Sequence, residues 1–461
     1  MSPRSRWMAM VVFGLLIMLL PACGAETPLP IPAATAPHTP EPTGAQFTTA
    51  AEQDSAPAPE SLNGAASKEL VLSFTYQRAD GNRLASGAGA VPFAQVLDLP
   101  LEGRPVWVAA FPAEVGSLWV AVLEDGRAQA FHVFAPNRAE PVSVVPNTMP
   151  PGMPPMGYSV ADFPALGVPP SETASILSHA VILTDTIRLA YLETNGGLVV
   201  SDGYHEWREE INAPPDARLL ADEQDRILVL ADATGRYPHG ALGDELEAGS
   251  IKLIRTNPVP QVIRSITIDP PAVVEGLAPI WTDLDGDGNR EIVVTVSDAE
   301  LGARLVVYSE SGEQIAVSPA IGLGNRWLHL IAAGSFGPGG EMELVDVLTP
   351  HLEPVVAFFR IDRLKVAARL EGYTSHVLGS RNLDQAAGGD FDGDGLLEVL
   401  LMTPERTALA AVQHTIAGAR EIWKVPAGGK ITTNLGTVEL RAGQMVVGVG
   451  TDMQMLRLWL P

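Results

Sequence analysis

The sequence is poor in cysteine and in basic residues. Its 461 residues include one cysteine, Cys23, and 30 Lys and Arg against 54 Asp and Glu, for a formal charge of −24. A single cysteine excludes any disulfide within the chain, so stability must come from core burial, with bound metal as a further source. The acidic balance argues against nucleic acid as a partner, because neutralising phosphates needs Lys and Arg.

Apolar residues and turn formers are plentiful. The apolar classes make up 46% of the chain, and there are 44 Gly and 39 Pro. The apolar content allows a sizeable core. The Gly and Pro content predicts many turns between short elements.

The N-terminus has the pattern of an export signal. Two arginines precede an apolar run over residues 9–20, which ends in the letters LPAC at Cys23. The run is shorter than the roughly 20 residues that span a bilayer, so it predicts a signal peptide over 1–22. LPAC resembles the lipobox of bacterial lipoproteins. The resemblance implies a lipidated Cys23 and an extracytoplasmic chain anchored to a membrane of the bacterial cell envelope. An ordinary secretory signal with a chance cysteine is the alternative.

Residues 23–68 are predicted to be a disordered linker. They are rich in Ala, Pro, Thr and Glu and have almost no large apolar side chains. Such a segment buries too little surface to offset the entropy cost of ordering. We therefore interpret it as a tether between the lipid anchor and the folded part.

From residue 69 to 461 the pattern changes to short β-forming runs. Examples are SLWVAVLEDG, EIVVTVSD and EPVVAFFRID, which are rich in Val, Ile, Leu and aromatic residues. The helical period of 3.6 residues does not persist in any stretch. Turns such as Ser311-Gly312 indicate antiparallel hairpins, so the predicted class is all-β.

One loop sequence recurs in three copies. TDLDGDGNREIVV starts at Thr282, GGDFDGDGLLEVLLMTP starts at Gly388, and AAGSFGPGGEMELVDVLTP lies between them. The copies are 52 and 55 residues apart, and a polar loop followed by about four strands at this period is typical of a propeller blade. Weaker echoes elsewhere bring the predicted number of blades to seven, with six or eight left open.

Two expectations depend on this architecture. The run 69–76 should close the ring by pairing with the last blade near 445–460. The Pro-rich stretch 136–171 should be an insertion without structure of its own, which either contacts a partner or covers the ring, or is a floppy excursion.

The first loop has the chemistry of a cation site. Asp283, Asp285 and Asp287 alternate with residues that permit a tight turn, and Asn289 and Glu291 add oxygen ligands. A cage made of oxygen suits Ca²⁺ better than Mg²⁺ or Zn²⁺. A helix-flanked calcium loop would need an acidic residue at position 12. That position is Val294 in the first loop and Leu401 in the second, so the loop runs straight into a strand.

The pattern D-x-D-G-D-G-x-x-E followed by a β run resembles the FG-GAP or VCBS repeat of integrin α-subunit propellers and bacterial surface proteins. The resemblance implies two structural Ca²⁺ sites. By position their residues are Asp283, Asp285, Asp287, Asn289 and Glu291 in the first loop, and Asp390, Asp392, Asp394, Leu396 and Glu398 in the second. The middle copy keeps only Glu343, with Ser335, Gly337 and Gly339 at the aspartate positions, and should bind nothing.

Other candidates are weaker. SDGYHEWREEI, which includes Tyr204 and His205, is either a glycan-binding lip or a solvated outer strand. His329, His351, His376 and His414 are too far apart in the chain for a metal-ligand spacing, although a ring could gather them at its centre. Trp281 should pack between blades. The carboxylates of the acidic loops would be catalytic only if a position stayed open to substrate.

Three functions remain open. The favoured one is a monomeric, lipid-anchored, calcium-stabilised propeller that binds or scaffolds a protein or polysaccharide. The first alternative is an extracytoplasmic carbohydrate-active lyase or hydrolase with its site in the central pocket, and the second is a purely structural envelope component. No catalytic motif appears in the sequence, so an enzyme is disfavoured.

Overall fold

A computed structural model describes residues 70–74, 81–134, 138–183, 188–322 and 326–461. The predicted signal peptide over 1–22, Cys23 and the whole linker to residue 68 lie outside these residues. By its internal contacts Ala65–Pro461 forms one unit. Within the described part, no helix is both long and apolar enough to cross a bilayer.

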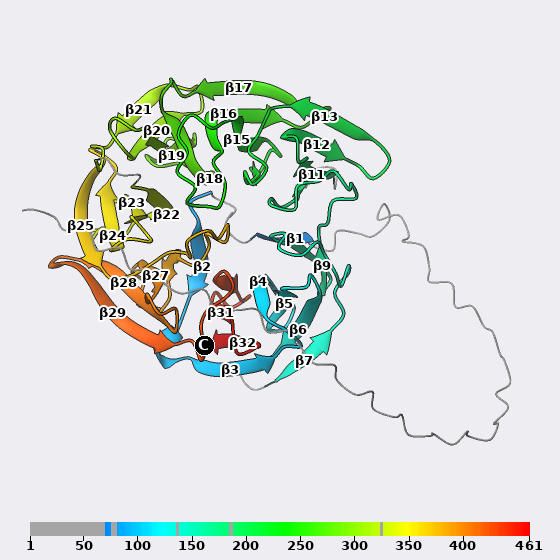
Figure 1. Ribbon diagram of the computed structural model, residues 1–461. Coiled ribbons are helices and arrows are strands. Elements are labelled where there is room, and N and C mark those ends of the chain that lie inside the picture. The colour runs from blue at the N-terminus through cyan, green and yellow to red at the C-terminus, as the bar shows by residue number, and fades with distance from the viewer. Residues whose placement is uncertain (1–69, 75–80, 135–137, 184–187, 323–325) are drawn as a thin grey trace, which may run out of the picture. The chain divides into compact units, whose positions relative to one another are not determined.

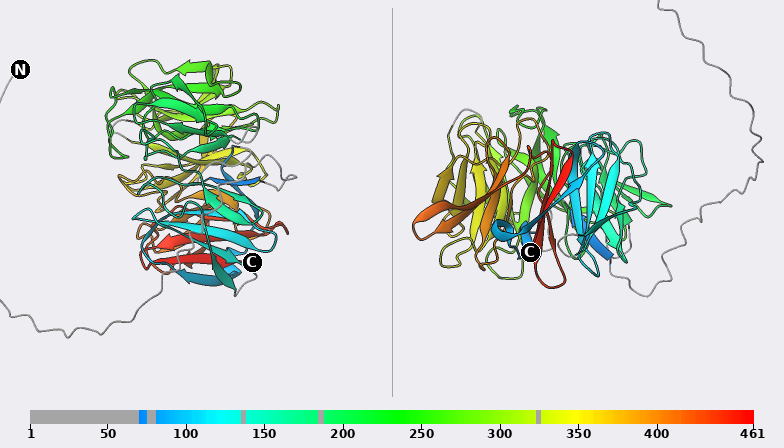
Figure 2. Two further views of the ribbon diagram at one scale, coloured as in Figure 1. Left: turned by 90° about the vertical axis from the view of Figure 1, so that its right-hand side faces the viewer. Right: turned by 90° about the horizontal axis from the view of Figure 1, so that it is seen from below.

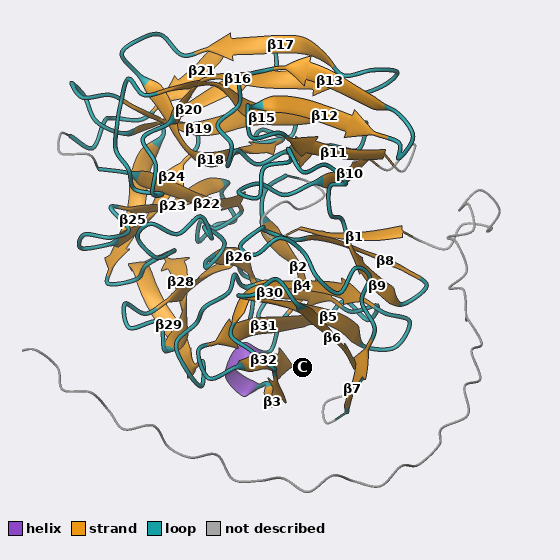
Figure 3. Cartoon of the chain, turned by 45° about the vertical axis from the view of Figure 1, so that its right-hand side comes forward, coloured by secondary structure: helices purple, strands orange, loops and turns teal. Residues whose placement is uncertain are grey.

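The regular secondary structure of the described residues is almost entirely β-strand. Figure 3 shows strands joined by loops, with one helical turn, η1 (Val91–Phe93). The predicted all-β class is confirmed. The runs SLWVAVL and EIVVTVS form strands that are buried along their whole length, which explains why they are apolar without alternation.

The repeating element is a four-stranded antiparallel sheet whose strands pair in chain order. Three such sheets are separate in the hydrogen-bond pattern. They are β4 to β7 (Pro105–Pro112, Ser117–Leu123, Ala128–Val133, Ala139–Val142), β10 to β13 (Val181–Leu183, Arg188–Leu192, Gly197–Ser201, Glu206–Glu210) and β22 to β25 (Leu328–Gly334, Glu343–Leu348, Val355–Arg360, Lys365–Glu371).

Two more four-stranded sets are joined into one sheet by a single residue pair, Ala248 with Val274. They are β14 to β17 (Leu220–Ala221, Ile227–Thr234, Glu247–Arg255, Gln261–Thr267) and β18 to β21 (Val273–Thr282, Glu291–Ser297, Arg304–Ser309, Gln314–Val317).

The remaining sheets combine distant parts of the chain. β2 (Leu84–Ala88) pairs in parallel with the first strand of β26 to β29 (Ala387–Asp390, Glu398–Met402, Ala408–Thr415, Gly418–Pro426). β3 (Gln95–Pro100) adds a fourth strand to β30 to β32 (Gly436–Glu439, Met445–Thr451, Met455–Leu460). A three-stranded sheet contains β1 (Leu70–Phe74), β8 (Met156–Val160) and β9 (Phe163–Leu166).

These sheets are arranged as a β-propeller. Figure 1 shows them side by side in a ring, with strands such as β7, β13, β17, β25 and β29 at the rim. Figure 2 shows the same ring from the edge, where strands run across its thickness. The ring holds seven four-stranded sets and the three-stranded sheet. The number of blades is eight if the three-stranded sheet is counted as a blade and seven if it is not. The predicted number of seven therefore stays a prediction.

The expected closure by residues 69–76 is wrong. Residues 70–74 pair with β8, and the last sheet is completed by β3, with Gln95 opposite Leu460. The reason is connectivity: elsewhere the rim strand of one set leads into the inner strand of the next, as β25 leads into β26 and β3 leads into β4. Arg457 strengthens the closing pair by donating two hydrogen bonds to Asp98, at 2.7 and 2.6 Å.

The stretch 136–171 is not an unstructured insertion. Its described residues supply β7, β8 and β9. Met149, Met153 and Met156 are 6%, 2% and 0% exposed, so they fill the core and do not form an adhesive surface. Burial of apolar side chains that β8 brings against the neighbouring sheet gives this segment its order.

Trp119 ties the first four-stranded set to the last one. It lies on β5, is fully buried, and belongs to a cluster that includes Val446 and Leu458. A Cβ added at Gly448 on β31 would lie 2.4 Å from a Trp119 ring carbon, so the indole needs glycine there.

We expect Gly448→Ala to lower the free energy of unfolding by about 1–3 kcal/mol, because the added methyl overlaps Trp119 in a packed core. Chemical denaturation measures the change. Gly235→Ala is the matched control, because its Cβ would meet only a backbone oxygen at 3.7 Å. Equal stabilities for the two variants would contradict the packing described here.

Candidate functional site

The two acidic loops occupy the same place in their blades. Each connects the first strand of a set to the second, as β18 to β19 and β26 to β27. Each ends on a glutamate that begins the second strand, Glu291 or Glu398. The loop geometry is therefore set by a hairpin of the blade.

The first loop is folded around Asp283. Its carboxylate accepts hydrogen bonds from the amides of Gly286 at 2.7 Å and Gly288 at 2.9 Å. These hydrogen bonds lower the pKa of Asp283. Both glycines have positive φ, at 81° and 87°, which the tight turn requires. Glu291 accepts the amide of Leu284 at 2.8 Å.

The second loop repeats this pattern. Asp390 accepts the amides of Gly393 at 2.7 Å and Gly395 at 3.2 Å, and Glu398 accepts the amide of Phe391 at 2.8 Å. One contact is added, because the indole of Trp423 donates to Asp392 at 3.0 Å. The agreement between loops that lie more than a hundred residues apart shows that the sequence pattern encodes one conformation.

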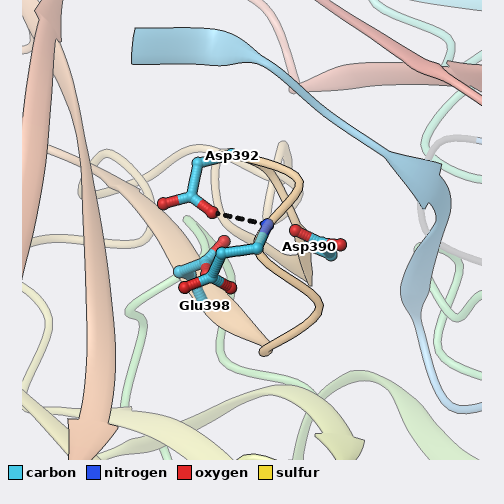
Figure 4. Close-up of side chains that lie close together, drawn as sticks. Asp390, Asp392 and Glu398 are labelled. Carbon is cyan, nitrogen blue, oxygen red and sulfur yellow. Dashed lines mark hydrogen bonds between the residues drawn. The ribbon is translucent and has the colours of Figure 1, made fainter.

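Carboxylate oxygens converge more completely in the second loop. Asp390, Asp392, Asp394 and Glu398 each place an oxygen within 4.8 Å of the others, whereas in the first loop this group consists of Asp283, Asp285 and Asp287. Figure 4 shows Asp390, Asp392 and Glu398 gathered around the second loop. The second loop thus has the more complete ligand set.

Glu398 is in an unfavourable environment without a cation. It is fully buried, and its Oε1 has no hydrogen-bond partner among the described residues. Burial, with the nearby aspartates, raises the pKa of Glu398 to about 9. Burial also raises the pKa values of Asp390 and Glu291. A bound cation would remove this penalty, because it favours the charged forms.

The other two predicted ligand positions contribute differently. Asn289 donates through its side chain to Asp287 at 3.2 Å and through its amide at 2.7 Å. Leu396 has no side-chain ligand atom, and its amide donates to Asp394 at 2.8 Å. Of these two, only Asn289 could add a side-chain oxygen to a cation.

In the middle copy the equivalent glutamate contacts other protein side chains. Glu343, the counterpart of Glu291 and Glu398, contacts His414 Nδ1 at 2.8 Å and lies 4.0 Å from Arg360. Arg360 also lies 3.2 Å from Glu341, which folds back over this loop. This loop therefore has protein side chains at its glutamate and no aspartates at the equivalent positions, and its lack of a metal site stays a prediction.

The inside of the ring is crossed by the connection between β25 and β26, residues 372–386. Its hydrogen bonds reach several blades: Gly379 to Ala241 at 3.0 Å, Asn382 to Val106 at 3.3 Å, and Gln385 to Thr433 at 3.0 Å. A cavity beside it, lined by Glu275, Trp327, His329 and Arg381 among others, measures about 30 Å³. That volume is about the share of one water molecule in the liquid, far less than a sugar ring.

Several charged residues cluster near this connection, although no sequence motif links them. Arg381 donates to Asp216 at 2.8 Å and also to Asp244, from 165 and 137 residues away. Burial and nearby carboxylates raise the pKa of Glu247 to about 9, so it is protonated at neutral pH. Sequence reasoning missed this cluster because its members share no motif.

The remaining candidates are placed as follows. His329, His351 and His376 lie together, whereas His414 is bound to Glu343. Trp281 is buried and lies 5.4 Å from the guanidinium of Arg226 in the adjacent set, so it packs between blades as predicted.

SDGYHEWREEI contributes the exposed rim strand β13 (Glu206–Glu210), which agrees with its interpretation as a solvated outer strand.

Comparison with known proteins gives no family. No protein-family model matches the chain, and no curated protein matches it. Among solved structures, the WD40 β-propeller domain of Doa1 has a TM-score of 0.41 and 8% identity, covering 79% of this chain and 95% of that one. BBS1N, solved in complex with ARL6DN, has a TM-score of 0.39 and 10% identity, covering 82% of this chain and 98% of that one.

The WD40 domain of Toxoplasma gondii coronin has a TM-score of 0.38 and 9% identity, covering 81% of this chain and 89% of that one. Likeness at this level carries no argument about function. The assignment of a propeller rests on the arrangement of the sheets.

We expect stability to fall as the pH drops below about 6.5, in part because of His179. This residue is buried, its Nε2 contacts the carbonyl of Leu219 at 3.1 Å, and burial lowers its pKa to about 3. The unfolded chain takes up the proton near pH 6.5 and the folded chain does not. Between pH 7 and 5 this difference costs about 2 kcal/mol.

Denaturant unfolding of wild type and His179→Gln at both pH values measures this contribution. The variant should lose correspondingly less stability on acidification. His205→Gln, whose side chain is 73% exposed, should keep the wild-type dependence. Identical slopes for wild type and His179→Gln would rule out a buried neutral histidine at this position.

Proposed function

We propose that this chain is a calcium-stabilised β-propeller that binds or scaffolds a protein or polysaccharide at the bacterial cell envelope, anchored by lipid on Cys23. The observation that carries the calcium part is the second acidic loop. There, four carboxylates converge and one buried oxygen, Glu398 Oε1, has no hydrogen-bond partner among the described residues.

The ligand chemistry favours Ca²⁺ over other cations. The converging atoms are all carboxylate oxygens, which suit a hard cation. The loop is irregular, which suits Ca²⁺ better than Mg²⁺, whose coordination is near-ideal octahedral. Zn²⁺ would favour His or Cys, and the loop offers neither. The role we infer is structural, because the ion would cross-link the start of β27 to the preceding turn.

Binding is favoured over catalysis by the inside of the ring. The cavity beside the connection 372–386 is too small for a sugar, and Arg381 is already paired with two aspartates. A carbohydrate-active enzyme would need both space and available acid or base groups at this centre. The rim and the loops remain as surfaces for a partner.

The anchor is inferred from sequence alone. The apolar run 9–20 and LPAC at Cys23 support lipidation, and the composition of 23–68 supports a tether. The chain would then act as a monomer held off the membrane surface.

We expect soluble residues 68–461 to melt several degrees higher in millimolar Ca²⁺ than with chelator. At a concentration 100 times Kd, a ligand of the folded state adds about 2.7 kcal/mol of stability. Calorimetry with and without calcium measures the shift. An unchanged melting curve, together with no bound metal in elemental analysis, would refute the calcium sites.

Substitutions separate the two loops. Asp394→Asn should remove more of the calcium-dependent shift than Asp287→Asn, because only the second loop gathers four carboxylates. Glu341→Gln in the middle copy is the matched control and should leave the shift unchanged, because Glu341 is paired with Arg360. A loss of the shift in Glu341→Gln would contradict the assignment.

Capture experiments test the binding role. Immobilised residues 68–461 should retain a ligand from envelope extracts or a glycan panel in calcium, and retain less with chelator as the loops lose order. Breakdown of a polysaccharide would favour the enzymatic alternative. No capture and no turnover in either condition would favour a purely structural component.

A further inference from the structure

Three histidines meet at one end of the blade formed by β22 to β25. His329 lies on β22, His351 follows β23, and His376 lies in the connection after β25. The ring centres of His376 and His351 are 4.5 Å apart, and those of His376 and His329 are 4.8 Å apart. The fold, and not a sequence motif, brings these imidazoles together.

The surrounding contacts hold this cluster in place. Thr374 Oγ1 donates toward the carbonyls of Pro350 at 2.9 Å and His376 at 3.0 Å, which fastens the loop of His376 to the loop of His351. Trp327 packs against His329 and His376, with ring centres 5.2 and 5.0 Å away. The positions of the rings are therefore defined by the blade.

Two of the ring nitrogens lack partners. Nε2 of His351 and Nε2 of His376 are buried and have no hydrogen-bond partner among the described residues. His376 as a whole is only 2% exposed. Buried polar atoms are nearly always paired in native proteins, so two orphans in adjacent rings point to a missing ligand.

The Nδ1 atoms of two of the rings contact one serine. Ser375 Oγ lies 2.7 Å from Nδ1 of His329 and 3.1 Å from Nδ1 of His376. For His376, a contact at Nδ1 leaves Nε2 as the free nitrogen, which is the usual arrangement of a metal-bound imidazole. Burial lowers the pKa of His376 well below its usual value and also lowers that of His351, so their lone pairs stay unprotonated at neutral pH.

We propose that His351 and His376 bind a divalent transition-metal ion such as Zn²⁺ through their two unpartnered Nε2 atoms. Imidazole nitrogen suits Zn²⁺ and its neighbours, whereas Ca²⁺ requires oxygen ligands. The site is separate from both acidic loops and does not depend on their occupancy.

Zinc binding to the full folded chain without a polyhistidine tag tests the proposal. The protein is first saturated with Ca²⁺ so that the oxygen sites are occupied. Equilibrium dialysis should then detect one Zn²⁺, and Co²⁺ substitution should give a visible d–d absorption band. His351→Gln and His376→Gln should each weaken zinc binding at least tenfold.

His205→Gln is the matched control, because His205 is an exposed histidine outside the cluster. It should bind zinc like wild type. Calcium-dependent melting of each variant reports whether the propeller still folds. Absence of zinc binding by wild type, or wild-type affinity in the His351→Gln/His376→Gln double variant, would overturn the proposal.

Discussion

The structure depends on one constraint: each sheet can be buried only by the sheets on either side of it. Strands such as β5, β19 and β31 have no exposed residue, so their sheets need neighbours on both faces. A row of such sheets would leave two apolar end faces exposed. The ring removes both ends, and the pairing of β3 with β32 fastens the closure. Trp119 on β5 packs against Gly448 on β31, so it holds the sheet of β4 to β7 against the sheet of β30 to β32 and β3.

The acidic loops follow from this arrangement. Each is the turn between two strands that the ring already holds in position, so its carboxylates are brought together by the blade and not by the loop alone. Where four of them converge, Glu398 Oε1 is left without a hydrogen-bond partner among the described residues. Where the aspartates are absent, His414 and Arg360 stand near the equivalent glutamate. The same position in the blade is therefore surrounded by carboxylates in one copy and by other protein side chains in another.

The inside of the ring has a different character. The connection 372–386 bridges several blades and leaves little space beside it, while Arg381 neutralises two aspartates. These contacts link several blades across the inside of the ring. The connection also carries His376, whose ring lies against that of His351.

Features that lie within a few neighbouring residues could be predicted from the sequence: the β class, the strand-flanked acidic loops, the repeat and hence the propeller. Hydrophobic runs and turn residues act locally, so they can be recognised without a fold. The closing strand, the order of residues 138–171, the histidine cluster and the pairing of Arg381 with Asp216 were decided only by tertiary structure. Their partners are up to several hundred residues apart, and only the burial of whole sheets against one another brings them together.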